Sequence, residues 1–135
     1  MDKLDTILLI DDDFTTNFLH KKRISQSEID SRVEVANNGA EGINKLLALN
    51  ETIQASNALV LVFLDLNMPI MDGWDFLEAF KELKPKLNFN INLFIVSSSI
   101  NPDDRARAKN YSQVLDYFPK HLSVATLVKL TENCI

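Results

Sequence analysis

Five polar side chains mark places where this sequence could carry chemistry, because each follows the end of an apolar run. Asp11 and Asp12 follow the first run, Asp65 the third and Ser97 the fourth, and Lys120 stands just beyond the fifth. Carboxylates can bind a divalent cation or act as nucleophiles, and an ammonium group can neutralise an anion. These residues are far apart in the sequence, so they can act together only if the fold brings the ends of the runs to one place.

Short apolar runs bounded by turn-forming residues predict five β-strands. The run from Leu59 to Leu64 is apolar throughout, which is typical of a central strand that is buried on both faces. The predicted strands are Thr6–Ile10, Arg32–Ala36, Leu59–Leu64, Ile91–Val96 and Leu115–Phe118.

Segments with helical patterns or helix-start signals separate and follow these strands. Gly73–Leu83 places apolar residues on one stripe, and Asn101-Pro102 combines a capping side chain with proline in the first turn. Glu51 to Asn57 is polar and predicts a loop or a frayed helix end. The other predicted helices are Phe14 to about Ser27, with Phe14, Phe18 and Leu19 as its apolar residues, Glu41–Leu49, and a last helix capped by Ser123, with Val124, Leu127, Val128 and Leu130 able to pack inward.

The order of these elements is strand then helix, five times over. Such alternation predicts an α/β fold, a doubly wound five-stranded parallel sheet with five helices on its two faces. Ligands in such sheets bind just beyond the carboxyl ends of the strands. We therefore expect Asp11, Asp12, Asp65, Ser97 and Lys120 to converge at one edge. The 135 residues predict a single domain, 1–135, with no output domain.

Three clustered carboxylates repel one another, and a bound cation would relieve that repulsion. Mg²⁺ suits a site of a few carboxylates and several waters. Asp65 could then act as a nucleophile toward a phosphoryl donor, while Lys120 pairs with the phosphoryl oxygens and Ser97 donates a hydrogen bond to them. Taken singly, each residue has an ordinary explanation as a cap, turn or surface residue. Their joint occurrence at one sheet edge argues against all of these explanations holding together.

The composition limits the classes of function. A hydrophobic fraction of 46% and a charged fraction of 24% are those of a soluble globular protein, and the net charge of −5 argues against direct DNA binding. The single cysteine, Cys134, cannot form an internal disulfide and is interpreted as a helix-end residue. The amino terminus does not resemble a signal peptide, and the longest apolar run, Ala58 to Leu64, is too short to insert in a membrane. We expect a cytoplasmic protein.

Four stretches of the sequence resemble one family when they are taken together and in order. "ILLIDDD", "VFLDLNMPIMDG", "FIVSSS" and "DYFPK" are similar to the motifs of the receiver domain of two-component response regulators, in the stand-alone CheY-like form. The resemblance covers essentially the whole chain, and the central block is its most specific part. It implies the flavodoxin/CheY-like fold with strand order 2-1-3-4-5.

The resemblance also implies roles for individual residues. Asp65 resembles the phospho-acceptor, and the metal ligands would be Asp11, Asp12, Asp65 and the backbone carbonyl of Asn67, with Mg²⁺ as the cofactor. Lys120 resembles the lysine that binds the phosphate.

Two further positions match residues that respond to phosphorylation in this family. Ser97 resembles the switch hydroxyl, and Tyr117 falls at the aromatic switch position. The surface that changes is formed by the fourth helix, fifth strand and fifth helix. The protein would then be a switch and not an enzyme, catalysing only its own phosphorylation and slow dephosphorylation.

The partners implied are a histidine kinase, a histidine phosphotransfer protein or both, with an acyl phosphate as a possible small donor. The downstream protein target is not indicated, and a place as an intermediate in a phosphorelay is an open alternative. The basic run His20-Lys21-Lys22-Arg23 lies where this family commonly docks its kinase, although it could equally be a solvated helix face.

One departure from the family pattern concerns the residue after Lys120. The family usually has proline there, often after a cis bond, whereas this sequence has Pro119 before the lysine and His121 after it. A cis bond without proline costs about 3–4 kcal/mol, so the sequence leaves the Lys120–His121 bond open between trans and an enforced cis form.

Two rival functions use similar residues. Haloacid-dehalogenase-like phosphohydrolases have a D-x-D motif whose second acid protonates the leaving group, but Asn67 occupies that position and cannot donate a proton as a general acid. A degenerate receiver that serves only as an interaction module would not need the phosphorylation residues, all of which are present.

Overall fold

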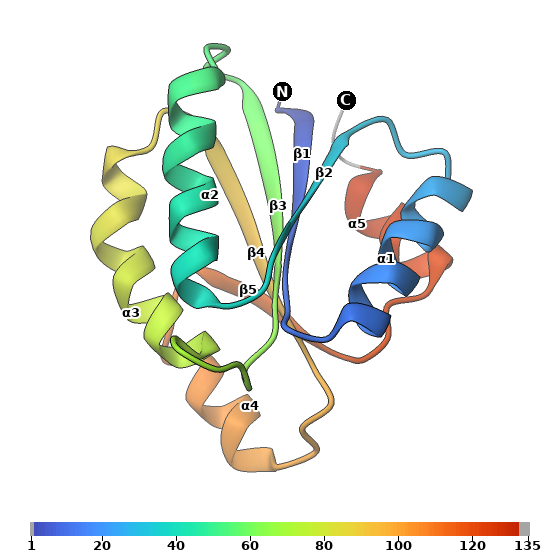
Figure 1. Ribbon diagram of the computed structural model, residues 1–135, viewed down its shortest axis with the longest axis vertical. Coiled ribbons are helices and arrows are strands. Elements are labelled where there is room, and N and C mark those ends of the chain that lie inside the picture. The colour runs from blue at the N-terminus through green and yellow to red at the C-terminus, as the bar shows by residue number, and fades with distance from the viewer. Residues whose placement is uncertain (1, 133–135) are drawn as a thin grey trace.

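A parallel sheet of five strands forms the centre of the protein, with the order β2-β1-β3-β4-β5 (Figure 1). The computed structural model describes residues 2–132, so Cys134 lies outside the described residues. This order and the helices on both faces confirm the predicted fold class. The strands are β1 (Lys3–Ile10), β2 (Arg32–Ala36), β3 (Ala58–Leu64), β4 (Asn90–Ser97) and β5 (Val114–Pro119).

Helices cover both faces of the sheet. In Figure 1, α1 and α5 lie on one side, and α2 and α3 lie on the other. The helices are α1 (Phe14–Gln26), α2 (Gly39–Thr52), α3 (Gly73–Leu83), α4 (Pro102–Ala108) and α5 (Val124–Thr131), and a short 3₁₀ helix, η1 (Lys84–Lys86), follows α3. None of the helices within residues 2–132 is both long enough and apolar enough to cross a membrane.

Strand β3 is buried along its whole length, as its apolar sequence predicts. Its side chains alternate between the two faces of the sheet. Val60, Val62 and Leu64 belong to the core cluster on the side of α2 and α3, whereas Leu61 and Phe63 belong to the cluster on the side of α1 and α5. Packing on both faces, together with pairing to β1 and β4, fixes the end of β3 and the residue that follows it.

Helix α2 is longer at both ends than the predicted Glu41–Leu49. Asn38 caps it by accepting a hydrogen bond from the Glu41 N–H at 2.9 Å, and the helix continues to Thr52. Glu51 and Thr52 therefore belong to the helix, which agrees with the frayed helix end that the sequence left open for the start of Glu51 to Asn57. The sequence Asn37-Asn38-Gly39 follows the end of β2 and also begins α2. The sequence pattern indicated the end of the strand but not the start of the helix.

Helix α1 forms where the sequence predicts it, but two of its apolar residues do not face the core. Phe14 and Phe18 are 80% and 60% exposed, and the two rings stack on each other with centroids 6.4 Å apart. Three of the four buried residues of the helix are polar, and the buried residues are Thr16, Asn17, His20 and Ile24. In α5, Leu127 is buried as predicted, but Val128 is exposed.

Candidate functional site

The backbone at the carboxyl edge of the sheet holds two aspartates side by side. The N–H of Asp65 donates to the carbonyl of Ile10 at 2.9 Å, and the N–H of Asp11 donates to the carbonyl of Ala36 at 3.0 Å. Both bonds continue the strand pairing by one residue beyond the strands. The positions of Asp11 and Asp65 are therefore set by the sheet and not by flexible loops.

Three carboxylates meet at this edge. One oxygen from each of Asp11, Asp12 and Asp65 lies within 4.8 Å of the others. Asp11 and Asp65 are buried, and Asp12 is exposed, so the cluster is open to solvent on one side. Carboxylate oxygens with room for water are the ligands that Mg²⁺ prefers, and the donor set fits this ion.

The side chain of Lys120, which directly follows the carboxyl end of β5, reaches the same cluster. Its Nζ lies 2.8 Å from Oδ2 of Asp11 and 3.5 Å from Oδ2 of Asp65. Burial alone would lower the pKa of Lys120, but the two carboxylates raise that pKa above its ordinary value. The lysine is therefore charged at neutral pH, and it compensates only part of the negative charge of the three acids.

The surroundings of the Asp65 carboxyl group strongly alter its pKa. Burial, and then the nearby carboxylate of Asp11, raise the pKa of Asp65 to about 6, with the ammonium of Lys120 opposing them. Asp65 is ionised at neutral pH, but its charge is poorly compensated. A bound cation would favour the ionised form.

This raised pKa predicts how stability depends on pH. The pKa of Asp65 is about 6 in the folded chain against 3.8 as the ordinary value, so the folded state loses stability as pH rises from about 4 to about 6. Asp65→Asn removes that cost. In the absence of divalent cations, we expect the variant to be about 1–2 kcal/mol more stable than the parent protein at pH 8, and equal to it near pH 4. Urea unfolding at several pH values measures this difference, and a less stable variant at pH 8 would refute the argument.

Ser97 is the last residue of β4, and Tyr117 lies within the neighbouring strand β5. Ser97 is fully buried, its Oγ accepts a hydrogen bond from the Ser99 N–H at 3.1 Å, and its carbonyl accepts one from the Lys120 N–H at 3.1 Å. The Tyr117 ring is buried, and its hydroxyl reaches the carbonyl of Ser99 at 3.5 Å. One short loop therefore connects the predicted switch hydroxyl with the predicted aromatic switch.

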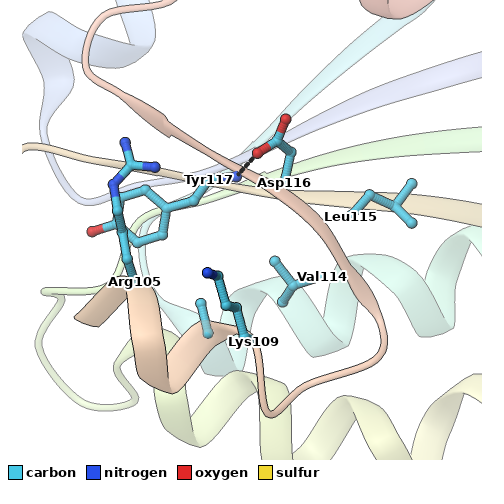
Figure 2. A pocket seen from close by; sticks show the side chains of 7 residues that line it. Arg105, Lys109, Val114, Leu115, Asp116 and Tyr117 are labelled. Atoms are coloured by element: carbon cyan, nitrogen blue, oxygen red, sulfur yellow. Dashed lines mark hydrogen bonds between the residues drawn. The ribbon is translucent and has the colours of Figure 1, made fainter. Parts of the chain in front are cut away.

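The other side of Tyr117 forms a wall of a surface pocket between α4 and β5 (Figure 2). The pocket has a volume of about 230 Å³, and the Arg105 guanidinium lies 4.7 Å from the centre of the Tyr117 ring. Its remaining lining residues are Ala108, Lys109, Val114, Leu115 and Asp116. A change in the position of Tyr117 would alter this pocket directly.

The loop after Asp65 is folded tightly. The N–H of Gly73 donates to the carbonyl of Leu66 at 2.9 Å, and the N–H of Met71 donates to that of Pro69 at 2.7 Å across Ile70. Ile70 has a φ of 68°, which is rare for a β-branched residue. Asn67 is exposed, two residues beyond Asp65. Asp72 caps α3.

The predicted basic patch on α1 is wrong in part. His20 is only 3% exposed, and burial, followed by nearby positive groups, lowers its pKa to about 4. His20 is therefore neutral at pH 7. The Arg23 guanidinium is used internally, because it donates to the carbonyl of Leu122 at 2.7 Å. Lys21 and Lys22 are exposed, as a surface patch requires.

The peptide bond between Lys120 and His121 is cis, which answers the question that the sequence left open. Nε2 of His121 lies 3.1 Å from Oγ1 of Thr16. Thr16 and Asn17 were not identified from the sequence, although both contact the site: the Asn17 amide donates to the carbonyl of Asp11 at 2.9 Å. The available signal was the row of polar residues at helical spacing in α1, opposite Phe14 and Phe18.

Comparison with known proteins gives one family. The family described as the response regulator receiver domain matches residues 7–132. The chain is 31% identical to a two-component response regulator from Cytophaga hutchinsonii, with 96% of each chain covered and a TM-score of 0.78. None of the curated proteins compared with the chain matches it.

Two more solved structures share the fold. A response regulator receiver protein from Dyadobacter fermentans is 23% identical over 96% of this chain and 95% of its own, with a TM-score of 0.78. The Mn²⁺-bound form of response regulator Rcp1 is 24% identical over 95% of this chain and 89% of its own, with a TM-score of 0.70.

Proposed function

The chain belongs to the response regulator receiver domain family, whose members are phosphorylation-dependent signalling switches, and we propose that Asp65 is the residue that becomes phosphorylated. The observation that carries this proposal is the position of Asp65. It lies beside the carboxylates of Asp11 and Asp12, and the ammonium of Lys120, which also pairs with Asp11, is 3.5 Å away. A nucleophile, an acidic cation site and a fixed positive charge are thus present together.

We propose Mg²⁺ as the cofactor, held by Asp11, Asp12, Asp65 and the backbone carbonyl of Asn67. The three clustered carboxylates support this choice, because their oxygens lie close enough to share one hard cation. When bound, the ion supplies positive charge for the phosphoryl oxygens. The protein's part is to hold the carboxylates rigidly, which the backbone bonds of Asp11 and Asp65 to neighbouring strands do.

The proposed donor is the phosphohistidine of a histidine kinase or a phosphotransfer protein. An Oδ atom of Asp65 forms a bond to phosphorus while the bond from phosphorus to the donor's imidazole nitrogen breaks. The imidazole keeps that electron pair and takes a proton from solvent. Lys120 then pairs with a phosphoryl oxygen in place of the Asp65 carboxylate. An exposed face of α1 beside the site, with Phe14, Phe18 and Lys21, supports a protein donor.

We further propose that phosphorylation changes the face formed by α4, β5 and α5. Phosphoryl oxygens on Asp65 would draw the Ser97 hydroxyl, which now accepts a hydrogen bond from Ser99. Tyr117 contacts the carbonyl of Ser99 and lines the pocket between α4 and β5, so a shift of this loop can alter the pocket. A downstream protein would recognise the altered face.

The test of this switch is Ser97→Ala. Beryllofluoride with Mg²⁺ stands in for the phosphoryl group, and amide NMR shifts of residues in α4 and β5 report the change. We expect large shifts in the parent protein and loss of most of them in Ser97→Ala, although acetyl phosphate still labels the variant. Ser98→Ala, next along the chain and exposed, is the matched control. Equal shifts in Ser97→Ala and the parent would contradict the assigned role.

A further inference from the structure

Helix α1 buries several polar residues and exposes its two aromatic residues, and its inner face makes specific contacts. Thr16, His20 and Arg23 lie at helical spacing on that face. Each contacts the segment that directly follows Lys120 in the chain. An inner face built for hydrophobic packing would not need these side chains, so their contacts call for a separate explanation.

Both backbone groups of Leu122 bind to this face. The Leu122 N–H donates to Nε2 of His20 at 3.0 Å, and the Leu122 carbonyl accepts from Nη1 of Arg23 at 2.7 Å. His20 can accept because it is neutral at pH 7. The Leu122 side chain is buried in the core beside Ile24. Leu122 is therefore fixed to α1 at its N–H, its carbonyl and its side chain.

His121 is held by the same helix. The hydroxyl of Thr16 donates to Oδ2 of Asp13 at 2.8 Å, so it is free to accept from Nε2 of His121, which lies 3.1 Å away. The His121 ring also packs edge-on against the ring of His20, with centroids 5.7 Å apart. His121, which makes these contacts, stands at the position where the family pattern has proline after the lysine.

These contacts affect the position of Lys120. The lysine side chain is long and flexible, so the place that its Nζ atom reaches depends on how firmly the backbone is held. The Lys120 N–H is bonded to the carbonyl of Ser97, and the next two residues are bonded to α1, so the backbone of Lys120 is held on both sides. From this fixed backbone, the Nζ atom lies 2.8 Å from Oδ2 of Asp11 and 3.5 Å from Oδ2 of Asp65. Phosphoryl transfer depends mainly on positioning, so a small shift of Lys120 would slow it.

We propose that His20 and Arg23 are positioning residues, which place the phosphate-binding lysine by holding the backbone of Leu122. This inference rests on the proposed phosphorylation of Asp65. It assigns to α1 a part in the reaction that is separate from any docking on its outer face. A simpler role, in which the two side chains only satisfy buried backbone groups, predicts an effect on stability alone.

A double-mutant cycle with Lys120→Ala separates the two roles. The rate of labelling by acetyl phosphate with Mg²⁺ is measured by intact mass for His20→Ala, Lys120→Ala and the double variant. We expect His20→Ala to slow labelling about tenfold when Lys120 is present and to have little effect when Lys120 is absent. His20→Gln, which keeps an acceptor for the Leu122 N–H, should recover most of the rate. Ser25→Ala, on the exposed side of the same helix, is the control.

Two outcomes would overturn the inference: an unchanged rate in His20→Ala, or an equal loss of rate with and without Lys120. If His20→Ala does not fold, the same cycle is run with Arg23→Gln, with Arg23→Lys as the conservative variant. Absence of labelling in the parent protein would instead refute the proposed function, so the two failures are distinguishable.

Discussion

Replacing Lys120 with alanine should slow the phosphorylation of Asp65 by acetyl phosphate about 100-fold. The ammonium lies 3.5 Å from the Asp65 carboxylate, where it can pair with a phosphoryl oxygen as the new bond forms. It is partly buried, with only 12% of its side chain exposed, so its charge is weakly screened by solvent. Removing it also leaves the Asp11 and Asp65 carboxylates facing each other without compensation, which should raise the pKa of Asp65 further.

The rate of this reaction can be measured by intact mass at saturating Mg²⁺. Lys86→Ala is the matched control, because Lys86 is an exposed lysine that precedes β4 and so lies toward the opposite edge of the sheet. We expect the control to label at the parental rate. A Lys120→Ala variant that is folded and labels within twofold of the parent would show that the lysine does not take part.

Gly73→Ala should lower the free energy of unfolding by about 2–3 kcal/mol. A Cβ atom at Gly73 would lie 2.5 Å from the backbone carbonyl oxygen of Asp65 and 2.8 Å from Cα of Leu66. Both are backbone atoms at the end of the buried strand β3, so they cannot rotate away as a side chain could. The variant must displace the backbone that carries Asp65, and we expect slower phosphorylation as well as lower stability.

Gly42→Ala provides the comparison within the same protein. A Cβ atom there would lie 2.7 Å from Cδ1 of Ile10 and 3.1 Å from a ring atom of Phe76, and both are side-chain atoms. Small rotations can relieve these contacts, and alanine favours a helix over glycine by up to about 1 kcal/mol. We expect a change of less than about 1 kcal/mol, measured by urea unfolding. Equal losses of unfolding free energy in Gly73→Ala and Gly42→Ala would contradict the argument that the close contact of Gly73 with the backbone of Asp65 requires glycine.

The sheet and the order of its elements could be predicted because the sequence signal is strong there. An entirely apolar run bounded by turn signals, such as β3, is typical of a strand buried on both faces, and the parallel arrangement then brings Asp11 and Asp65 together. The carboxyl-edge rule therefore predicted the approach of Asp11, Asp12, Asp65 and Lys120 from topology alone. The catalytic roles of these residues are still predictions.

The inner face of α1 could not be predicted in the same way. Phe14 and Phe18 indicated a helix but not which of its faces is buried, and the buried face instead carries Thr16 and His20, which contact the loop after Lys120. Those needs arise between residues about 100 positions apart in the chain and leave no local pattern. The same limit explains why His20 was assigned to a basic surface patch.

The role of Gly73 could likewise be predicted from the sequence only in part. The sequence Asp72-Gly73 indicates a turn into a helix, and Asp72 does cap α3. The close approach of Gly73 to the backbone of Asp65 depends on how the loop folds back, including the positive φ of Ile70. Neither a periodicity nor a turn signal encodes such a long-range contact.

The central claim is that Asp65 accepts a phosphoryl group with the help of a divalent cation. Its most direct test is the intact mass of the protein after incubation with acetyl phosphate and Mg²⁺, beside Asp65→Asn and a sample containing EDTA. We predict one added phosphoryl group in the parent protein, and none in the variant or in the EDTA sample. Failure of the parent to label, or equal labelling of Asp65→Asn, would contradict the account.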